Sequence, residues 1–220
     1  MKKNLTEIVF ILDRSGSMRG LEADTIGGFN SLIDQQKEKE GECLVSTVLF
    51  DHCQEVIHDR VSLDKISPMT AEDYYVRGST ALLDAVGEAI HHIGTVHKYA
   101  RDEDRPQKTM FIITTDGMEN SSSRYSHYDI KRLIGRQKEK YGWEFLFLGA
   151  NMDAVEVAES VGIRADRAVT YKCDSAGTEL NYRVLSQAVS AVRDCECSDA
   201  CFALGSDWKE EIEADFSKRG

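Results

Sequence analysis

Three polar loops carry the side chains whose types and spacing are best suited to chemistry. In the first loop, residues 13–18, an aspartate and two serines alternate, so an extended turn points their oxygens to one side, and a glycine lets the backbone bend tightly. The second loop, residues 77–82, adds a threonine hydroxyl, and the third, residues 114–120, adds a second carboxylate. Carboxylates and hydroxyls form a hard oxygen cluster that suits Mg2+, Mn2+ or Ca2+, and not zinc or copper. The side chains concerned are Asp13, Ser15, Ser17, Thr80 and Asp116.

Each of these residues also has an ordinary structural interpretation. Aspartate and hydroxyl residues after a strand commonly cap the following helix, and Asp13 or Thr80 taken alone is more typical of a cap than of a ligand. The D-x-S-x-S pattern by itself is moderate evidence. The evidence for a cation site is the set of three loops, each placed where one edge of a sheet is expected.

Short continuous apolar runs predict the strands that position these loops. Such runs are typical of parallel strands buried on both faces, and they occupy residues 8–12, 44–50, 110–113 and 143–148, with a weaker run at 168–171. Residues 54–61 interleave polar side chains, which indicates an edge strand. Because only residues 51–53 separate it from the preceding strand, the two are predicted to form an antiparallel hairpin.

Helical periodicity fills the segments between the strands. Apolar residues recur at helical spacing within 25–39, 82–97, 128–140, 154–161 and 180–192, and residues 208–216 are a candidate for a short charged helix. Alternating strands and helices predict an α/β fold with a doubly wound, mostly parallel sheet and helices on both faces. Ligands of such sheets bind beyond the carboxyl ends of the strands, so the three polar loops should meet at one edge.

The strands and loops together resemble the von Willebrand factor A (VWA) family, also called the integrin I-domain fold. Residues 8–18 read IVFILDRSGSM and are similar to the family's first strand and its D-x-S-x-S motif. Residues 78–85, GSTALLDA, resemble the segment with the family's threonine, and residues 112–117, IITTDG, the strand with its last aspartate. The match runs from about residue 7 to about 150, and more loosely to about 171. The resemblance implies a Rossmann-like sheet of six strands in the order 3-2-1-4-5-6, with one antiparallel edge strand.

The resemblance also implies a function. The family's motif residues form a metal-ion-dependent adhesion site (MIDAS), so Asp13, Ser15, Ser17, Thr80 and Asp116 would hold a divalent cation, Mg2+ being expected and Mn2+ or Ca2+ the alternatives. A partner protein would donate a Glu or Asp carboxylate as the last ligand. Intracellular members of bacterial type often work in multi-protein assemblies, some with AAA-type ATPases. Arg14 and Met18 flank the motif and either contact the partner or simply fill the loop.

The chain is expected to consist of a VWA-like domain, residues 1–193, and a charged, cysteine-containing extension, residues 194–220. The motif-bearing part of the domain is residues 7–150. Six cysteines are present and are expected to be thiols, with Cys43 packed in a strand. Cys195, Cys197 and Cys201 are close enough to hold zinc or a redox pair, although their spacing matches no standard zinc motif and no fourth ligand is evident.

Composition limits the classes of partner. The net charge of -11 disfavours binding to nucleic-acid phosphates and to anionic membrane surfaces. The longest apolar run, residues 8–12, is far shorter than the roughly 20 residues that cross a bilayer. No small-residue cleavage site follows the basic start, so a cytoplasmic protein is expected.

Two other functions fit parts of the sequence. A strand that ends in aspartate also begins haloacid-dehalogenase-type phosphotransferases, but those need a second carboxylate two residues later, where this chain has Ser15. A phosphate-binding G-x4-G-K-[ST] loop is absent from the sequence, and His91, His92 and His97 are expected at the surface rather than as bases. The second alternative is a zinc or thiol function centred on the cysteines of the extension. We expect a binding module, with a metal-dependent phosphotransferase or hydrolase as the alternative.

Overall fold

The apolar runs form the strands of a six-stranded sheet in the order β3-β2-β1-β4-β5-β6. The computed structural model describes residues 2–150, 153–195 and 204–219. The pairs β1–β2, β1–β4, β4–β5 and β5–β6 are parallel, and only β2–β3 is antiparallel among the described strands. The strands are β1 (Lys2–Asp13), β2 (Glu42–Phe50), β3 (Gln54–Ser62), β4 (Pro106–Thr115), β5 (Glu144–Ala150) and β6 (Ala168–Tyr171). The sheet order and the antiparallel edge hairpin predicted above are confirmed.

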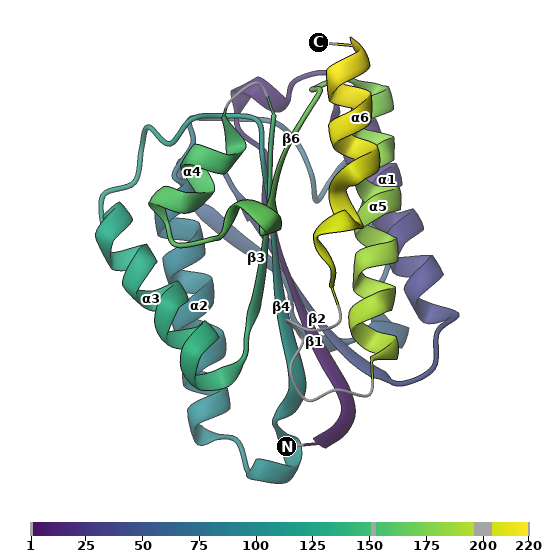
Figure 1. Ribbon diagram of the computed structural model, residues 1–220, viewed down its shortest axis with the longest axis vertical. Helices are drawn as coiled ribbons and strands as arrows, with labels where there is room; N and C mark the ends of the chain where they lie inside the picture. The colour runs from purple at the N-terminus through teal and green to yellow at the C-terminus, as the bar shows by residue number, and fades with distance from the viewer. Residues whose placement is uncertain (1, 151–152, 196–203, 220) are drawn as a thin grey trace.

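Helices cover both faces of the sheet (Figure 1). The helices α1, α5 and α6 lie on one face, and α2, α3 and α4 on the other. Their bounds are α1 (Glu22–Lys37), α2 (Leu82–Tyr99), α3 (His127–Tyr141), α4 (Ala154–Ser160), α5 (Ser175–Asp194) and α6 (Glu210–Arg219). None of the described helices combines the length and apolar character needed to cross a membrane.

Alternation along β1 supplies both hydrophobic cores. Phe10 and Leu12 pack beneath α1 and α5, whereas Val9 and Ile11 pack beneath α2 and α3. All four side chains are buried, because a central parallel strand has a helical layer on each side. This double burial explains why the strand reads as a continuous apolar run.

Local capping signals set the ends of several helices. Ser126 and Asp129 form a reciprocal capping box at the start of α3, and Gly142 ends that helix in the left-handed conformation with φ of 65°. Asp153 and Asp174 accept hydrogen bonds from backbone N–H groups at the starts of α4 and α5. The helix α5 begins at Ser175, earlier than the apolar periodicity alone indicates.

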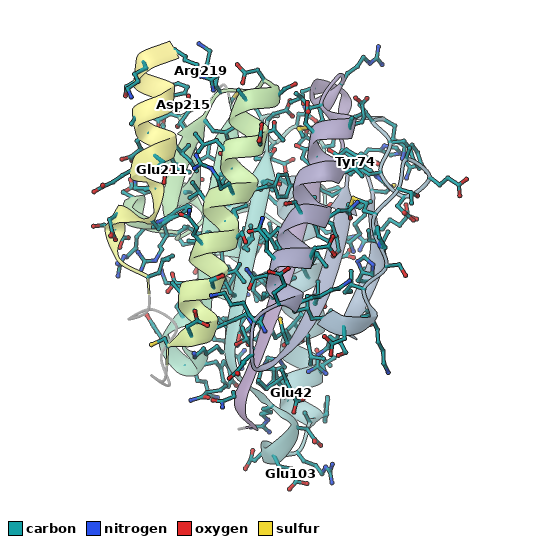
Figure 2. The ribbon with its side chains drawn as sticks, turned by 90° about the vertical axis from the view of Figure 1, so that its right-hand side faces the viewer. Glu42, Tyr74, Glu103, Glu211, Asp215 and Arg219 are labelled. Carbon is teal, nitrogen blue, oxygen red and sulfur yellow. The ribbon has the colours of Figure 1, made fainter. Side chains whose placement is uncertain are left out.

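The described part of the extension packs against the domain. Ile212 of α6 is 1% exposed and joins the core formed with α5 and β6, and Trp208 donates its indole N–H to the carbonyl of Asp166 at 2.9 Å. Figure 2 shows α6 beside α5, with Asp215 and Arg219 toward the same end of the molecule as Tyr74. The domain boundary at residue 193 stays a prediction. Cys197 and Cys201 lie outside the described residues.

Candidate metal centre

The five oxygen-bearing residues lie at the carboxyl ends of the two central strands. Asp13 ends β1, and Ser15 and Ser17 follow in a 3-10 turn, whereas Asp116 directly follows β4. Thr80 lies just before α2. Asp13, Ser15, Thr80 and Asp116 are all buried, and Ser17 is exposed, so the group opens to solvent at that serine. The structure therefore brings together all five residues that the sequence singled out.

Three hydroxyl groups from the first and second loops converge around Gly117 of the third. A Cβ atom at Gly117 would lie 2.6 Å from Thr80 Oγ1, 3.2 Å from Ser17 Oγ and 3.4 Å from Ser15 Oγ. The Oγ atoms of Ser15 and Ser17 are 3.0 Å apart, and Ser17 Oγ donates to Asp116 Oδ1 at 2.5 Å. Only a residue without a side chain leaves this space open.

One of these hydroxyls lacks a hydrogen-bond partner. Thr80 is 3% exposed, and its Oγ1 makes no hydrogen bond with any residue that the structure describes. This oxygen is not among the buried side-chain atoms that lack a partner in the described residues, so water or an ion can reach it. The oxygen donor set and this hydroxyl both fit a divalent cation.

Burial destabilises the charge on both carboxylates. It raises the pKa of Asp13 from 3.8 to about 6, although hydrogen bonds from Thr115 and Ser15 act in the opposite direction. Burial also raises the pKa of Asp116, against hydrogen bonds from Ser17 and Cys173. Thr115 Oγ1 donates to Asp13 Oδ2 at 2.5 Å, and the Ser15 N–H donates to Asp13 Oδ1 at 2.7 Å. A cation bound here would offset the cost of the two buried negative charges.

Backbone hydrogen bonds tie the three loops to one another. The Gly16 N–H donates to the carbonyl of Gly78 at 3.1 Å, and Gly78 itself has a φ of +69° that favours glycine. The Thr80 N–H donates to Asn120 Oδ1 at 2.9 Å, and the Asn120 N–H donates back to the carbonyl of Thr80 at 3.0 Å. The relative positions of the oxygen donors are thus fixed by the backbone.

The side chains of Arg14 and Met18 are buried, so neither is available for direct contact with a partner. Arg14 is fully buried, and its Nε donates to Asp51 Oδ2 at 2.9 Å, while Met18 is 5% exposed. Tyr74 donates its hydroxyl to the carbonyl of Asp13 at 2.5 Å. Of the two interpretations of these flanking residues, the structure agrees with loop filling.

The three histidines of α2 differ from one another. His91 and His92 are exposed, as expected, and His92 contacts Asp59. The surface prediction was wrong for His97, whose side chain is 12% exposed and forms a hydrogen bond between its Nε2 and buried Glu7. His97 also packs edge-on against Trp143, with ring centroids 5.3 Å apart. No pattern of local sequence indicated this pairing, because Glu7 lies in the middle of β1, 90 residues from His97 in the chain.

Cys173 is the functional-site residue that sequence reasoning missed. Its Sγ lies 3.5 Å from Asp116 Oδ2, on the opposite oxygen from the one bonded to Ser17. The signal available was its position: it follows β6 closely, so it lies at the same edge of the sheet as the polar loops.

A second group of metal-ligating atoms occurs in the turn between β2 and β3. The donor atoms of Asp51, His52 and Cys53 all lie within 4.8 Å of one another. However, Asp51 Oδ2 already accepts hydrogen bonds from Arg14 Nε at 2.9 Å and Arg77 Nε at 2.8 Å. Burial raises the pKa of Asp51, but the hydrogen bonds from Arg77, Cys53 and Arg14 outweigh it and hold the pKa at about 2. Two guanidinium groups on one carboxylate oppose a nearby cation, so this group is the weaker candidate.

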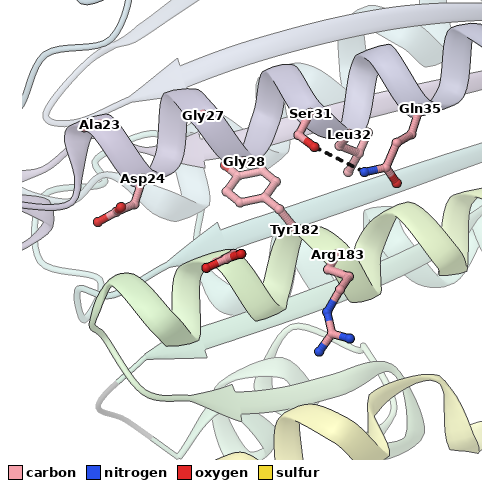
Figure 3. A pocket seen from close by; sticks show the side chains of 10 residues that line it. Ala23, Asp24, Gly27, Gly28, Ser31, Leu32, Gln35, Tyr182 and Arg183 are labelled. Carbon is pink, nitrogen blue, oxygen red and sulfur yellow. Dashed lines mark hydrogen bonds between the residues drawn. The ribbon is translucent and has the colours of Figure 1, made fainter.

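A groove lies between α1 and α5, on the face of the sheet that these two helices cover (Figure 3). The ring of Tyr182 lies against Gly28, where a Cβ would meet Tyr182 Cδ2 at 2.2 Å, so the glycine lets the two helices approach closely. Its polar lining side chains include Asp24, Gln35 and Arg183. They form no cluster comparable with the oxygen donors at the sheet edge.

Comparison with solved structures identifies the fold. A von Willebrand factor type A protein from Catenulispora acidiphila matches with a TM-score of 0.58 and 17% identity over 86% of this chain and 43% of its own. The pilus adhesin SpaC from Lactobacillus rhamnosus GG matches with a TM-score of 0.64 and 13% identity over 87% of this chain and 31% of its own. Proximal thread matrix protein 1 from the mussel byssus, in a structure with a zinc-occupied MIDAS motif, has a TM-score of 0.59 and 10% identity over 86% of this chain and 49% of its own.

The described chain therefore has the α/β fold of von Willebrand factor A domains. No protein-family model and no curated protein matches the sequence. The chain spans less than half of the length of each of the three solved proteins named above.

Proposed function

We propose that this protein is a metal-dependent binding module that grips a partner protein through a divalent cation. The observation that carries the proposal is that three separate loops meet where β1 and β4 end. The hydroxyls of Ser15, Ser17 and Thr80 surround Gly117, with Asp116 bonded to Ser17 and Asp13 bonded to the Ser15 N–H. The Thr80 hydroxyl supports it further, because its oxygen forms no hydrogen bond with a described residue and lies beside Ser15 and Ser17 at Gly117, where it could bind an ion. Mg2+ is the ion expected from five hard oxygen donors, with Mn2+ and Ca2+ as alternatives.

The charges of the proposed site explain why a bound cation would bind a carboxylate of a partner. The ion's two positive charges meet only two protein carboxylates, Asp13 and Asp116, and the other donors are neutral hydroxyls. A Glu or Asp side chain of a partner would complete the coordination with a strong, short-ranged, charge-assisted bond. Ser17 is exposed, which provides the direction from which a partner would approach.

We infer the partner class from the charge and the resemblance. The partner is a protein with an accessible acidic side chain, in keeping with a multi-protein assembly such as one that contains an AAA-type ATPase. The net charge of -11 disfavours nucleic acid and anionic membranes as partners. Cys43, Cys53, Cys173 and Cys195, the cysteines that the structure describes, are thiols, which supports a cytoplasmic location.

A metal-dependent phosphotransferase or hydrolase is the competing proposal. Its mechanism needs a second carboxylate to move a proton, two residues after the aspartate. Ser15 occupies that position, and its hydroxyl contacts Ser17 rather than a base. The donor set of the site favours binding over catalysis.

The test is calorimetric titration of Mg2+ and Mn2+ into the chelator-treated protein and into Asp13→Ala. The wild type should bind one ion and Asp13→Ala none that is measurable, with both circular dichroism spectra alike. An affinity capture from cell extract, with and without chelator, then asks whether any partner is held through the ion. Equal metal affinity in the two proteins would defeat the site assignment.

A further inference from the structure

A thiol lies beside the oxygen donors of the proposed metal centre. Asp116 is bracketed by two different donors: Ser17 Oγ donates to Oδ1 at 2.5 Å, and Cys173 Sγ lies 3.5 Å from Oδ2. The side chain of Cys173 is only partly buried, so an ion from solvent can reach it. An oxygen cluster with sulfur at its margin has a different metal preference from oxygen donors alone.

The loop that carries this thiol is held from both sides. Asp174 Oδ1 accepts the N–H of Gly177 at 2.8 Å at the start of α5, and its Oδ2 pairs with Arg219 Nη1 of α6 at 2.6 Å. Lys172 donates to the carbonyl of Arg219 from the other side of the cysteine. A Cβ at Gly177 would lie 2.0 Å from the carbonyl oxygen of Lys172, so the loop is closely packed on the first turn of the helix. The position of the sulfur is thus set by α5 and α6 together.

The distance between sulfur and carboxylate suits a shared ion. Zinc bonds to sulfur at about 2.3 Å and to carboxylate oxygen at about 2.1 Å, so two such ligands on a tetrahedral ion lie about 3.6 Å apart. The observed separation of Cys173 Sγ and Asp116 Oδ2 is 3.5 Å. An ion can therefore bridge the two atoms without rearrangement of the loop.

We propose that Cys173 is a ligand of this metal centre, where with Asp116 it captures a thiophilic divalent ion of the Zn2+ class in competition with Mg2+. This inference rests on the proposed metal site and adds a sulfur ligand to its oxygen donors. The hydroxyls of Thr80, Ser17 and Ser15, which would surround a Cβ at Gly117, place the remaining oxygen donors next to Asp116. It follows that the identity of the ion in this site would depend on the concentration of Zn2+ as well as that of Mg2+.

An exposed thiol in another loop, Cys53, supplies a control. Cys53 lies in the turn between β2 and β3, with Arg77 Nη2 at 3.6 Å and Asp51 Oδ1 at 3.3 Å from its sulfur. Replacing Cys53 by serine removes an accessible thiol and the sulfur ligand of the weaker group at Asp51, His52 and Cys53, without touching the oxygen donors of the sheet edge. Replacing Cys195, Cys197 and Cys201 together by serine removes the thiols of the extension in the same way.

The experiment measures Zn2+ and Mg2+ affinity by competition calorimetry in the wild type, Cys173→Ser, Cys53→Ser and the triple variant of the extension. Cys173→Ser should weaken Zn2+ binding by about tenfold or more, and leave Mg2+ binding within about twofold. Co2+ loaded in place of Zn2+ should show a near-ultraviolet thiolate charge-transfer band in all proteins except Cys173→Ser. Cys173→Ala repeats the test without a hydroxyl that could itself bind the ion.

The outcomes separate this inference from the proposed function. A thiol that only hydrogen-bonds to Asp116 would affect Mg2+ and Zn2+ alike and give no charge-transfer band, which would overturn the inference. Unchanged Zn2+ affinity and an unchanged band in Cys173→Ser would overturn it as well, while Mg2+ binding that depends on Asp13 would leave the proposed function standing. Failure of the wild type to bind either ion would remove both.

Discussion

Gly117 shows how a single backbone position shapes the metal centre. It lies between Asp116, whose carboxylate contacts Ser17, and a loop that hydrogen-bonds to Thr80. The hydroxyls of Ser15, Ser17 and Thr80 all approach the place where its side chain would be. The absence of a Cβ is therefore as much a part of the donor arrangement as the oxygen atoms are.

Gly117→Ala should weaken Mg2+ binding by about tenfold or more, because the added methyl group would displace Thr80 Oγ1 from 2.6 Å. Calorimetric titration measures the effect. The control is Gly135→Ala in α3, where a Cβ meets nothing within 4 Å, and where the change should leave metal affinity intact. Comparable affinities in the two variants would show that the three hydroxyls do not surround the ion.

The motif residues could be predicted from sequence because their signal is local. Asp13, Ser15 and Ser17 alternate within one turn, and Thr80 and Asp116 lie in two further polar loops that the family pattern also matches. Cys173 could not be identified in this way, since it lies 57 residues from Asp116 and approaches it only after β4, β5 and β6 are assembled. The burial of Arg14 could not be predicted from the sequence either, because its partner Asp51 belongs to another loop.

At the scale of elements, the turn between β2 and β3 supports the loop that carries the motif. The Arg14 N–H donates to the carbonyl of Phe50 at 2.8 Å, and the Ala81 N–H donates to the carbonyl of Asp51 at 2.8 Å. The Asp51 carboxylate also pairs with Arg14 and Arg77. The hairpin that the short 51–53 link predicts therefore hydrogen-bonds to both the first and the second polar loop and connects them.

Asp51→Ala should lower the free energy of unfolding by about 3–5 kcal/mol, because it leaves the fully buried guanidinium of Arg14 without this partner. Urea denaturation measures the change. Glu55 offers a matched control: it also pairs with Arg14, at 2.8 Å, but its side chain is 50% exposed. Glu55→Gln should therefore cost at most about 1 kcal/mol. Equal losses in the two variants would mean that burial does not decide the strength of these pairs.

At the scale of the whole molecule, β1 ends with Asp13 of the proposed metal centre, and its start lies at the opposite end of the sheet, near the N-terminus marked in Figure 1. The strand order could be predicted because the resemblance implied it and the short hairpin link agreed with it. The packing of α6 could not, since neither periodicity nor the family pattern specifies where an extension docks. That docking connects Arg219 to the loop of Cys173, so the extension and the metal centre share one hydrogen-bonded edge.

Because that edge buries two carboxylates, the stability of the whole chain should depend on pH in opposite ways with and without metal. Asp13 has a folded-state pKa of about 6, above its ordinary 3.8, so the native state holds its proton more tightly than the unfolded state does. In metal-free protein the stability should therefore fall as pH rises from about 4 to about 6, by an amount on the order of 3 kcal/mol, and then level off.

Saturating Mg2+ should reverse this slope, because the ion binds only the deprotonated carboxylate of the native state and adds stability as the proton leaves. Urea denaturation at a series of pH values, with and without Mg2+, measures both slopes. Asp13→Asn carries no titratable group at this position, so subtracting its curve from that of the wild type isolates Asp13 from the other acidic residues. If the two proteins show the same pH dependence in both conditions, the carboxylate of Asp13 is neither destabilised by burial nor stabilised by an ion, and the electrostatic basis of the metal centre fails.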